Sequence, residues 1–288
     1  MDKDEIIKKA GDAKYISGIY NYCDRWCERC PLTARCLNYS CTEEEESDSP
    51  ENHDLNNKAF WDKLSNVFET TLEMLKDMAK EQNIDFDSVD TEADERREKQ
   101  KRQEAESHPL AKASMSYANT VAGWLKSQGE VFERKGHDLI RELELDLPNN
   151  DPNAQAADIT DCVEVVKWYQ FQIHVKLMRA LTNEDIPGLV EEGFPSDADG
   201  SAKVALMGLD RSIAAYSRLR EHFPEQEDNI LNILITLDRI RRGTEEEFPK
   251  ARAFVRPGFD EMPEAMTTGP SCSTDHRSQG HETTGQGS

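Results

Sequence analysis

Residues 159–181, with the sequence ITDCVEVVKWYQFQIHVKLMRAL, are the most apolar stretch of this 288-residue chain. Their apolar side chains recur at steps of three and four residues, which is the period of an α-helix. These side chains fall on two faces, and a helix with two apolar faces is expected to have neighbours on both sides. The first face comprises Val163, Val166, Tyr169, Ile173, Leu177 and Ala180, and the second comprises Trp168, Phe171, Val175 and Met178.

Similar periodicity predicts further helices on both sides of this stretch. Apolar residues at helical spacing mark residues 55–82, 111–145, 201–223 and 230–243, and the charged residues 91–107 are expected to be partly helical and exposed. The helix over 55–82 is expected to be amphipathic and to pack in the bundle through one apolar face. This face comprises Phe60, Trp61, Leu64, Phe68, Leu72, Leu75 and Met78. No segment alternates apolar and polar residues over the length of a strand. The chain is therefore predicted to be all-α, with an antiparallel bundle of about five helices.

The net charge of the chain limits its partners. Charged residues make up 32 % of the sequence, and the formal net charge is −22 at pH 7. A chain of this charge repels nucleic-acid phosphates and anionic lipids unless its basic residues are segregated, and those at residues 96–102 are interleaved with acids. No run of about 18 apolar residues is present, and the first 14 residues lack the apolar core of a signal peptide. We therefore expect a cytoplasmic protein that binds neither nucleic acid nor membrane.

Composition shifts along the chain predict four parts. Residues 1–41 hold five of the seven cysteines and are expected to form a small metal-binding module. Residues 42–54 are rich in Glu and Asp without Lys or Arg, which predicts an extended acidic linker. Residues 55–262 contain the periodic segments and are assigned to the helical bundle. Residues 263–288 are dominated by small and polar residues, which predicts a disordered tail.

The cysteines of the first part have the spacing Cys23-x3-Cys27-x2-Cys30-x5-Cys36, followed by Cys41. Thiols this close together in a reducing compartment are protected from oxidation when a metal binds them as thiolates. The sequence therefore predicts that the first four cysteines bind one metal centre. Cys41 is the alternative to Cys36 as the fourth ligand.

A helix over residues 15–30 would bring three of these thiols together. The first three cysteines would then lie at i, i+4 and i+7, along one helical face. Pro31 disfavours helical geometry at the residue before it, so the chain is expected to turn there and bring Cys36 to the site. The competing interpretation is that Ile16, Ile19 and these cysteines form one apolar stripe of inert core residues. The residues expected to offset the charge of bound thiolates are Arg25, Arg29 and Arg35.

The spacing leaves the identity of the metal open between two candidates. A single tight run of cysteines that includes a Cys-Pro pair is typical of iron–sulfur proteins, which predicts a [4Fe–4S] cluster for electron transfer or redox sensing. The alternative is a structural zinc knuckle on a helical interaction scaffold without catalysis. The spacing of the first three cysteines is also similar to that of radical S-adenosylmethionine enzymes. However, Arg29 stands where that family usually has an aromatic residue, and no strand–helix alternation for a barrel follows.

The rest of the chain offers no catalytic signature, so enzymatic activity is left open and a protein or redox partner is expected. Cys162 is expected to be a core residue because its neighbours at helical spacing are apolar. Glu164 is expected to pair with Arg211 or Arg218 from a neighbouring helix. The turn-rich run at residues 248–259 contains three phenylalanines and is expected to pack back on the bundle.

Overall fold

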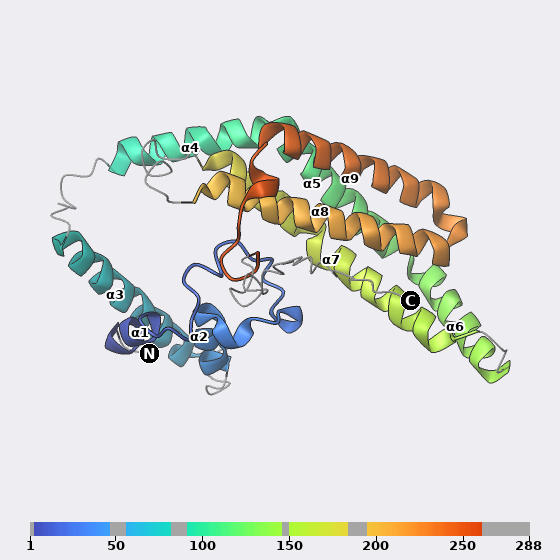
Figure 1. Cartoon of the computed structure of the whole chain (residues 1–288), viewed down its shortest axis with the longest axis horizontal. Coiled ribbons are helices and arrows are strands. Elements are labelled where there is room, and N and C mark those ends of the chain that lie inside the picture. Colours follow the sequence, from blue (N-terminus) through green and yellow to red (C-terminus); the bar gives the residue numbers. More distant parts are fainter. Residues whose placement is uncertain (1–2, 47–55, 82–90, 146–149, 184–194, 261–288) are drawn as a thin grey trace, which may run out of the picture.

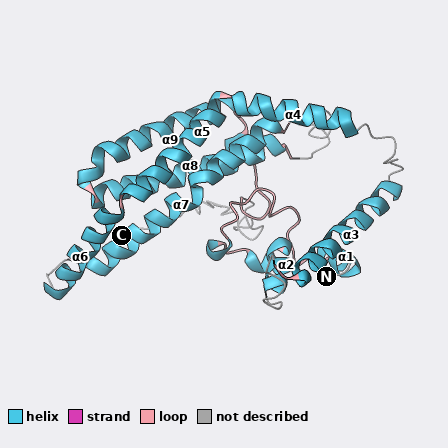
Figure 2. Cartoon of the chain, turned by 180° about the vertical axis from the view of Figure 1, so that it is seen from behind, coloured by secondary structure: helices cyan, strands magenta, loops and turns pink. Residues whose placement is uncertain are grey.

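The computed structural model describes residues 3–46, 56–81, 91–145, 150–183 and 195–260. All regular structure within these ranges is helical, which confirms the predicted all-α class (Figures 1 and 2). The α-helices are α1 (Lys3–Ala10), α2 (Leu37–Glu46), α3 (Lys58–Glu81), α4 (Thr91–Ser107), α5 (Pro109–Ser127), α6 (Gly129–Leu145), α7 (Pro152–Thr182), α8 (Asp197–His222) and α9 (Glu227–Glu247). The short 3₁₀ helices are η1 (Cys27–Arg29), η2 (Thr33–Arg35), η5 (Pro224–Gln226) and η6 (Ala251–Ala253).

Capping residues explain why α7 and α8 begin earlier than apolar periodicity predicts. The side chain of Asp151 accepts a hydrogen bond from the backbone N–H of Ala154 at 3.0 Å, and Pro152 occupies the first turn of α7. Ser196 caps α8 in the same way, accepting from the N–H of Asp199 at 3.0 Å. The first turns of both helices are therefore set by polar caps that carry no apolar signal.

The sequence predicts that Pro224 ends the helix over residues 201–223 and that Gly243 ends the helix over residues 230–243. Pro224 follows the end of α8 as predicted, but α9 continues through Gly243 to Glu247. A Cβ atom at Gly243 would lie 2.8 Å from Cδ2 of Leu110 in α5. This glycine therefore permits close contact between α5 and α9 and does not end the helix.

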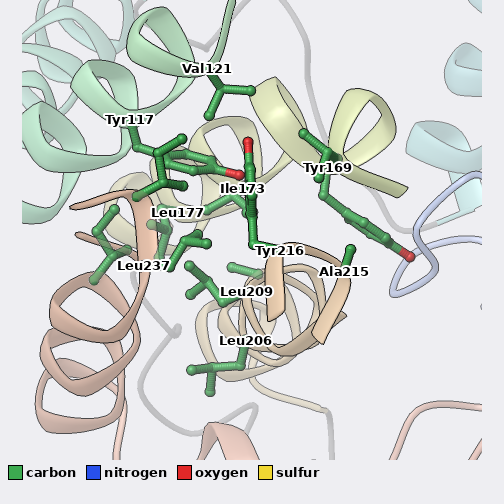
Figure 3. Close-up of a cluster of buried hydrophobic side chains, with 14 of the residues drawn as sticks. Tyr117, Val121, Tyr169, Ile173, Leu177, Leu206, Leu209, Ala215, Tyr216 and Leu237 are labelled. Atoms are coloured by element: carbon green, nitrogen blue, oxygen red, sulfur yellow. The ribbon is translucent and has the colours of Figure 1, made fainter. Parts of the chain in front are cut away.

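Helix α7 lies at the centre of the helices α5 to α9. It has its most extensive contact with α8, and it also packs against α5 and α6; α9 runs back along α8 and reaches α5 (Figure 1). The first predicted face of α7 is buried except for the half-buried Val163. Figure 3 shows Tyr169, Ile173 and Leu177 of this face among side chains of α5, α8 and α9. The buried side chains labelled there are Tyr117, Val121, Tyr169, Ile173, Leu177, Leu206, Leu209, Ala215, Tyr216 and Leu237.

The second predicted face of α7 is wrong in part. Phe171 and Val175 are 48 % and 59 % exposed, while Trp168 and Met178 are half-buried. Residues of the N-terminal segment cover Trp168, whereas none of the described helices covers Phe171 or Val175 enough to bury them. The apolar stripe therefore indicated a central helix correctly but overestimated how completely neighbours surround it.

The sequence predicts that the apolar face of helix α3 packs in the bundle. In the structure, this face does not contribute to the core. Figures 1 and 2 show it beside α1 and away from α5 to α9, and Lys3 of α1 forms an ion pair with Asp77 of α3. Its large apolar side chains are about half exposed or more at Trp61, Val67, Phe68, Leu72, Leu75 and Met78. Amphipathic periodicity predicted this helix correctly, but it does not specify which surface the apolar face meets.

The exposure of α3 leads to a prediction for the substitution Phe68→Ser. Because Phe68 is 65 % exposed, losing its ring should change the free energy of unfolding by less than about 0.5 kcal/mol. Chemical denaturation of the wild type and the variant measures this difference. A loss of more than about 2 kcal/mol, the size of a core truncation, would show that Phe68 is buried in solution.

The other predicted parts have mixed outcomes. Residues 42–46 belong to α2 and are helical, so the extended linker is wrong for them, while residues 47–54 lie outside the described ranges. The predicted tail at 263–288 also lies outside them. Within the described ranges, no helix is long and apolar enough to cross a membrane.

Candidate metal centre

The cysteine segment, residues 11–36, does not form the helix that the spacing of its cysteines predicts over residues 15–30. Residues 11–26 are turns and irregular backbone, and only Cys27–Arg29 forms a 3₁₀ turn. Gly18 and Arg25 have φ angles of 70° and 58°, in the left-handed region, which a right-handed helix excludes. The side chain of Asp24 accepts a hydrogen bond from the N–H of Trp26 at 3.2 Å and so closes a local turn.

The irregular path nevertheless brings the four predicted thiols to one cavity. Cys23, Cys27, Cys30 and Cys36 all line a space of about 20 Å³. The hydrogen bond from the N–H of Ile16 to the carbonyl of Arg35 (3.0 Å) holds the two ends of this segment together. Cys41 lies on α2 and does not line the cavity. The other lining residues are Ile19, Tyr20, Asp24, Arg25, Trp26, Thr33, Tyr39 and Phe259.

The thiols share this cavity without forming a complete ligand set. Across the described ranges, no group of three or more His, Cys, Asp or Glu side chains is arranged to hold a metal ion. None of the four cysteines is in a disulfide, so all four remain available as donors.

The surroundings of the thiols affect their acidity. Burial raises the pKa of Cys23, and the charges of Arg25 and Lys176 partly oppose that increase. Burial also raises the pKa of Cys27, and the neighbouring cysteines raise it further. The backbone N–H of Leu32 lies 3.4 Å from Sγ of Cys30 and points at it as a donor, an arrangement that supports a thiolate.

Asp24, between the first two cysteines, attaches the segment to the helices α7 and α8. Its carboxylate accepts hydrogen bonds from the hydroxyl of Tyr169 and from Nη1 of Arg211, both at 2.5 Å. Its backbone carbonyl accepts from Nε1 of Trp168 at 3.0 Å and from the amide of Gln172. Figure 3 shows Tyr169 extending out of the core toward the N-terminal segment. One residue therefore satisfies polar groups from two helices.

Trp26 and Arg29 extend this attachment. The ring of Trp26 stacks on Trp168 with centroids 5.0 Å apart and an interplanar angle of 15°. The guanidinium of Arg29 lies 4.1 Å from the Trp26 ring centroid and forms ion pairs of 2.5 Å with Asp161 and Glu164. The sequence predicts that Glu164 pairs with an arginine of the neighbouring helix. The prediction is wrong, because Glu164 pairs with Arg29 of the cysteine segment.

Only one of the three predicted compensating arginines lines the cavity. Arg25 does, whereas Arg29 faces the acids of α7 and Nε of Arg35 donates to the carbonyl of Lys14 at 3.4 Å. The buried Lys176 of α7 supplies a second positive charge whose field reaches Cys23. Sequence reasoning missed Lys176 because it lies 153 positions after Cys23 in the chain.

The C-terminal aromatic run closes the other side of the segment. Phe254 packs edge-on against Tyr22 with centroids 4.7 Å apart, and Phe259 lines the thiol cavity. Gly258, with a φ of 73°, approaches Ile16 so closely that a Cβ would lie 2.7 Å from its Cδ1. This run packs on α8 through η6, which confirms the prediction that it folds back, and Phe259 brings it to the thiol cavity.

Comparison with known proteins adds nothing to this geometry. No protein-family model matches the chain, and neither the curated proteins nor the solved structures yielded a match. Function must therefore be argued from the site itself.

The isolated Cys162 has the environment that the sequence predicted. It is fully buried in the core beside α8, and burial raises the pKa of its thiol. Such a thiol is a packing residue and not a nucleophile.

The ion pair between Asp197 and Arg179, next to the cysteine segment, predicts that the stability of the protein decreases in acid. Asp197, at the start of α8, is partly buried, which favours its neutral form. Hydrogen bonds from Arg179 and Asn183 outweigh this and hold the carboxyl pKa below its usual 3.8. The stabilisation is therefore complete above pH 3.8 and is lost as pH falls through the lower folded-state value.

The variant Asp197→Asn tests this assignment. We expect the melting temperature of the wild type to fall more steeply than that of the variant between about pH 4 and pH 2. Thermal unfolding followed by circular dichroism at several pH values makes the comparison. Parallel curves for the two proteins would contradict the assigned ion pair.

Proposed function

We propose that this chain is a metal-binding protein in which Cys23, Cys27, Cys30 and Cys36 hold one metal centre. The observation that carries the proposal is that four thiols from an irregular segment line a single small cavity. An inert core role accounts less well for this arrangement, because all four cysteines are only partly buried. The metal would supply the cross-link that the segment lacks, since the described part of it contains only short helical turns.

The donor set supports this proposal in three respects. Four thiolates form a complete tetrahedral set for a soft or borderline metal. The charges of Arg25 and Lys176 oppose the negative charge that such a centre would carry. The N–H group directed at Cys30 supplies the kind of outer hydrogen bond that orients a thiolate ligand.

The size of the cavity favours a single ion. A space of about 20 Å³ is close to the volume that admits one water molecule, which is on the order of 10–15 Å³. A single zinc ion would fill a space of this size, whereas the iron and sulfide ions of a four-iron cluster would need a larger one. We therefore favour structural zinc, with the helical body acting as a scaffold for a protein partner.

A [4Fe–4S] cluster is the second candidate, and one further observation supports it. Trp26 borders the thiol cavity and stacks on Trp168 of α7, so an aromatic contact leads from the site to the helical body. A cluster here would supply one-electron transfer or redox sensing. Both candidates assume a reducing compartment such as the cytoplasm, in which the thiols stay free of disulfides.

Elemental analysis of protein purified without oxygen tests the proposal. Zinc predicts colourless protein with about one zinc per chain, and the cluster predicts brown protein with iron and acid-labile sulfide. Protein that contains neither metal, and that binds neither when refolded with zinc or with iron and sulfide, would overturn the proposal.

A further inference from the structure

A second and larger cavity lies between α4, α5 and α7. Its volume of about 1100 Å³ is slightly above the range of about 300–1,000 Å³ of ligand pockets, and it shares no lining residue with the thiol cavity. The proposed metal centre does not involve this cavity. It can therefore be considered as an independent binding site.

The floor of this cavity is apolar. Met115 of α5 and Val175 of α7 are 38 % and 59 % exposed, and the half-buried Met178 lies one turn beyond Val175. Methionine side chains adapt to irregular ligand shapes, and solvent contact of these groups is unfavourable until something covers them. The floor therefore suits an apolar molecular body.

The rim of the cavity is basic, although the chain as a whole carries −22 charges. Four basic and two acidic side chains line it. Arg102 pairs with Glu106 at 3.0 Å and Arg179 pairs with Asp197, but Lys99 and Lys112 form no ion pair with any residue that the structure describes. Two ammonium groups therefore remain available at the rim of an apolar groove.

His174 adds a polar group without adding charge. Its Nδ1 lies 3.0 Å from Oγ of the buried Ser114, and burial lowers its pKa, so the ring is mostly neutral at neutral pH. The positive character of the groove therefore comes from the lysines and arginines.

We propose that this groove binds a small amphipathic anion. Its apolar body would lie on Met115, Val175 and Met178, and its carboxylate or similar acidic group would face Lys99 and Lys112. A polyanion such as nucleic acid does not fit, because the acidic surface beyond the groove would repel it.

Isothermal titration with dodecanoate, below its critical micelle concentration, tests this proposal, with dodecanol as the uncharged probe of similar length. We expect saturable binding of about one dodecanoate per chain, weakened at least about tenfold in Lys99→Gln/Lys112→Gln. Lys126→Gln serves as the matched control, because Lys126 is exposed on α5 outside the groove and should leave affinity unchanged. Val175→Asp should also weaken binding, through the apolar floor.

Several results would overturn the proposal. These are the absence of saturable dodecanoate binding, equal affinity in the double lysine variant, equal affinity for dodecanol, or unchanged binding by Val175→Asp. Equal affinity in the variants would assign binding to another apolar surface, such as the exposed face of α3. All substituted side chains are exposed, so circular dichroism should show that each variant remains folded.

Discussion

The substitution Cys27→Ser is expected to abolish stoichiometric metal binding. Cys27 is the thiol whose pKa the other three cysteines raise, so it lies within reach of the charges on all of them. A serine hydroxyl is a poor ligand for a soft or borderline metal, and a three-cysteine site would be incomplete. We expect the metal affinity to fall by more than about 100-fold, the upper end of the effect of outer-shell changes. A competition titration against a chelator measures this loss.

The substitution Cys41→Ser is the matched control. Cys41 is also a partly buried cysteine of the N-terminal segment, but it lies on α2 and does not line the thiol cavity. It should retain the affinity of the wild type. Loss of metal in Cys41→Ser, together with retention of metal in Cys36→Ser, would show that the fourth ligand is Cys41 and not Cys36. Unchanged metal content in Cys27→Ser would contradict the site itself.

The second large effect is expected from two glycine substitutions with opposite outcomes. A Cβ atom at Gly200 in α8 would lie 2.5 Å from Cδ1 of Tyr22 and 2.8 Å from Cζ of Phe254. Both rings are packed where the cysteine segment meets α8. Gly200→Ala should therefore destabilise the protein by about 1–3 kcal/mol, as overpacking of a dense contact does.

Gly136→Ala should change the free energy of unfolding in the opposite direction and stabilise the protein. Gly136 lies within α6, and nothing is found within 4 Å of a Cβ atom built there. Alanine should stabilise the helix by up to about 1 kcal/mol because it lowers the entropy cost of the helical backbone. Denaturant unfolding of both variants gives the comparison. Equal effects of the two substitutions would mean that Tyr22 and Phe254 do not pack against α8 in solution.

Apolar periodicity predicted the helices that form the core. The buried residues of α7 follow its first predicted face, and α8 and α9 contain the predicted ranges 201–223 and 230–243 in large part, because a helix inside a protein must present apolar side chains at intervals of three and four residues. Helix ends were less accurate where polar caps such as Asp151 and Ser196 extend the first turn. Gly243 was misinterpreted as a stop, since its role is contact with α5.

The cysteine segment shows where periodicity fails. Ile16, Ile19 and the cysteines have helical spacing, but the positive φ angles of Gly18 and Arg25 break the segment into turns. The contacts of Asp24 and Trp26 with α7 stabilise that path, and local sequence carries no information about partners more than 140 positions away. The same limit applies to α3, whose apolar face was predicted but whose exposure was not.

The cysteines that gather at the thiol cavity could be predicted from the sequence, but the residues from other elements that surround them could not. The density of cysteines alone marked Cys23, Cys27, Cys30 and Cys36, and the structure brings all four to one cavity. Lys176 and Phe259 could not be anticipated, because their roles depend on tertiary packing. Trp26, a large aromatic residue within the cysteine segment, is a local signal that could have indicated this contact with α7.

X-ray absorption spectroscopy at the edge of the metal that copurifies with the protein examines the first coordination sphere directly. The proposed centre predicts four sulfur neighbours, at about 2.3 Å if the metal is zinc, and about three when Cys27 is replaced by serine. A first shell made of nitrogen and oxygen in the wild-type protein would contradict the assignment of these four cysteines as the ligands.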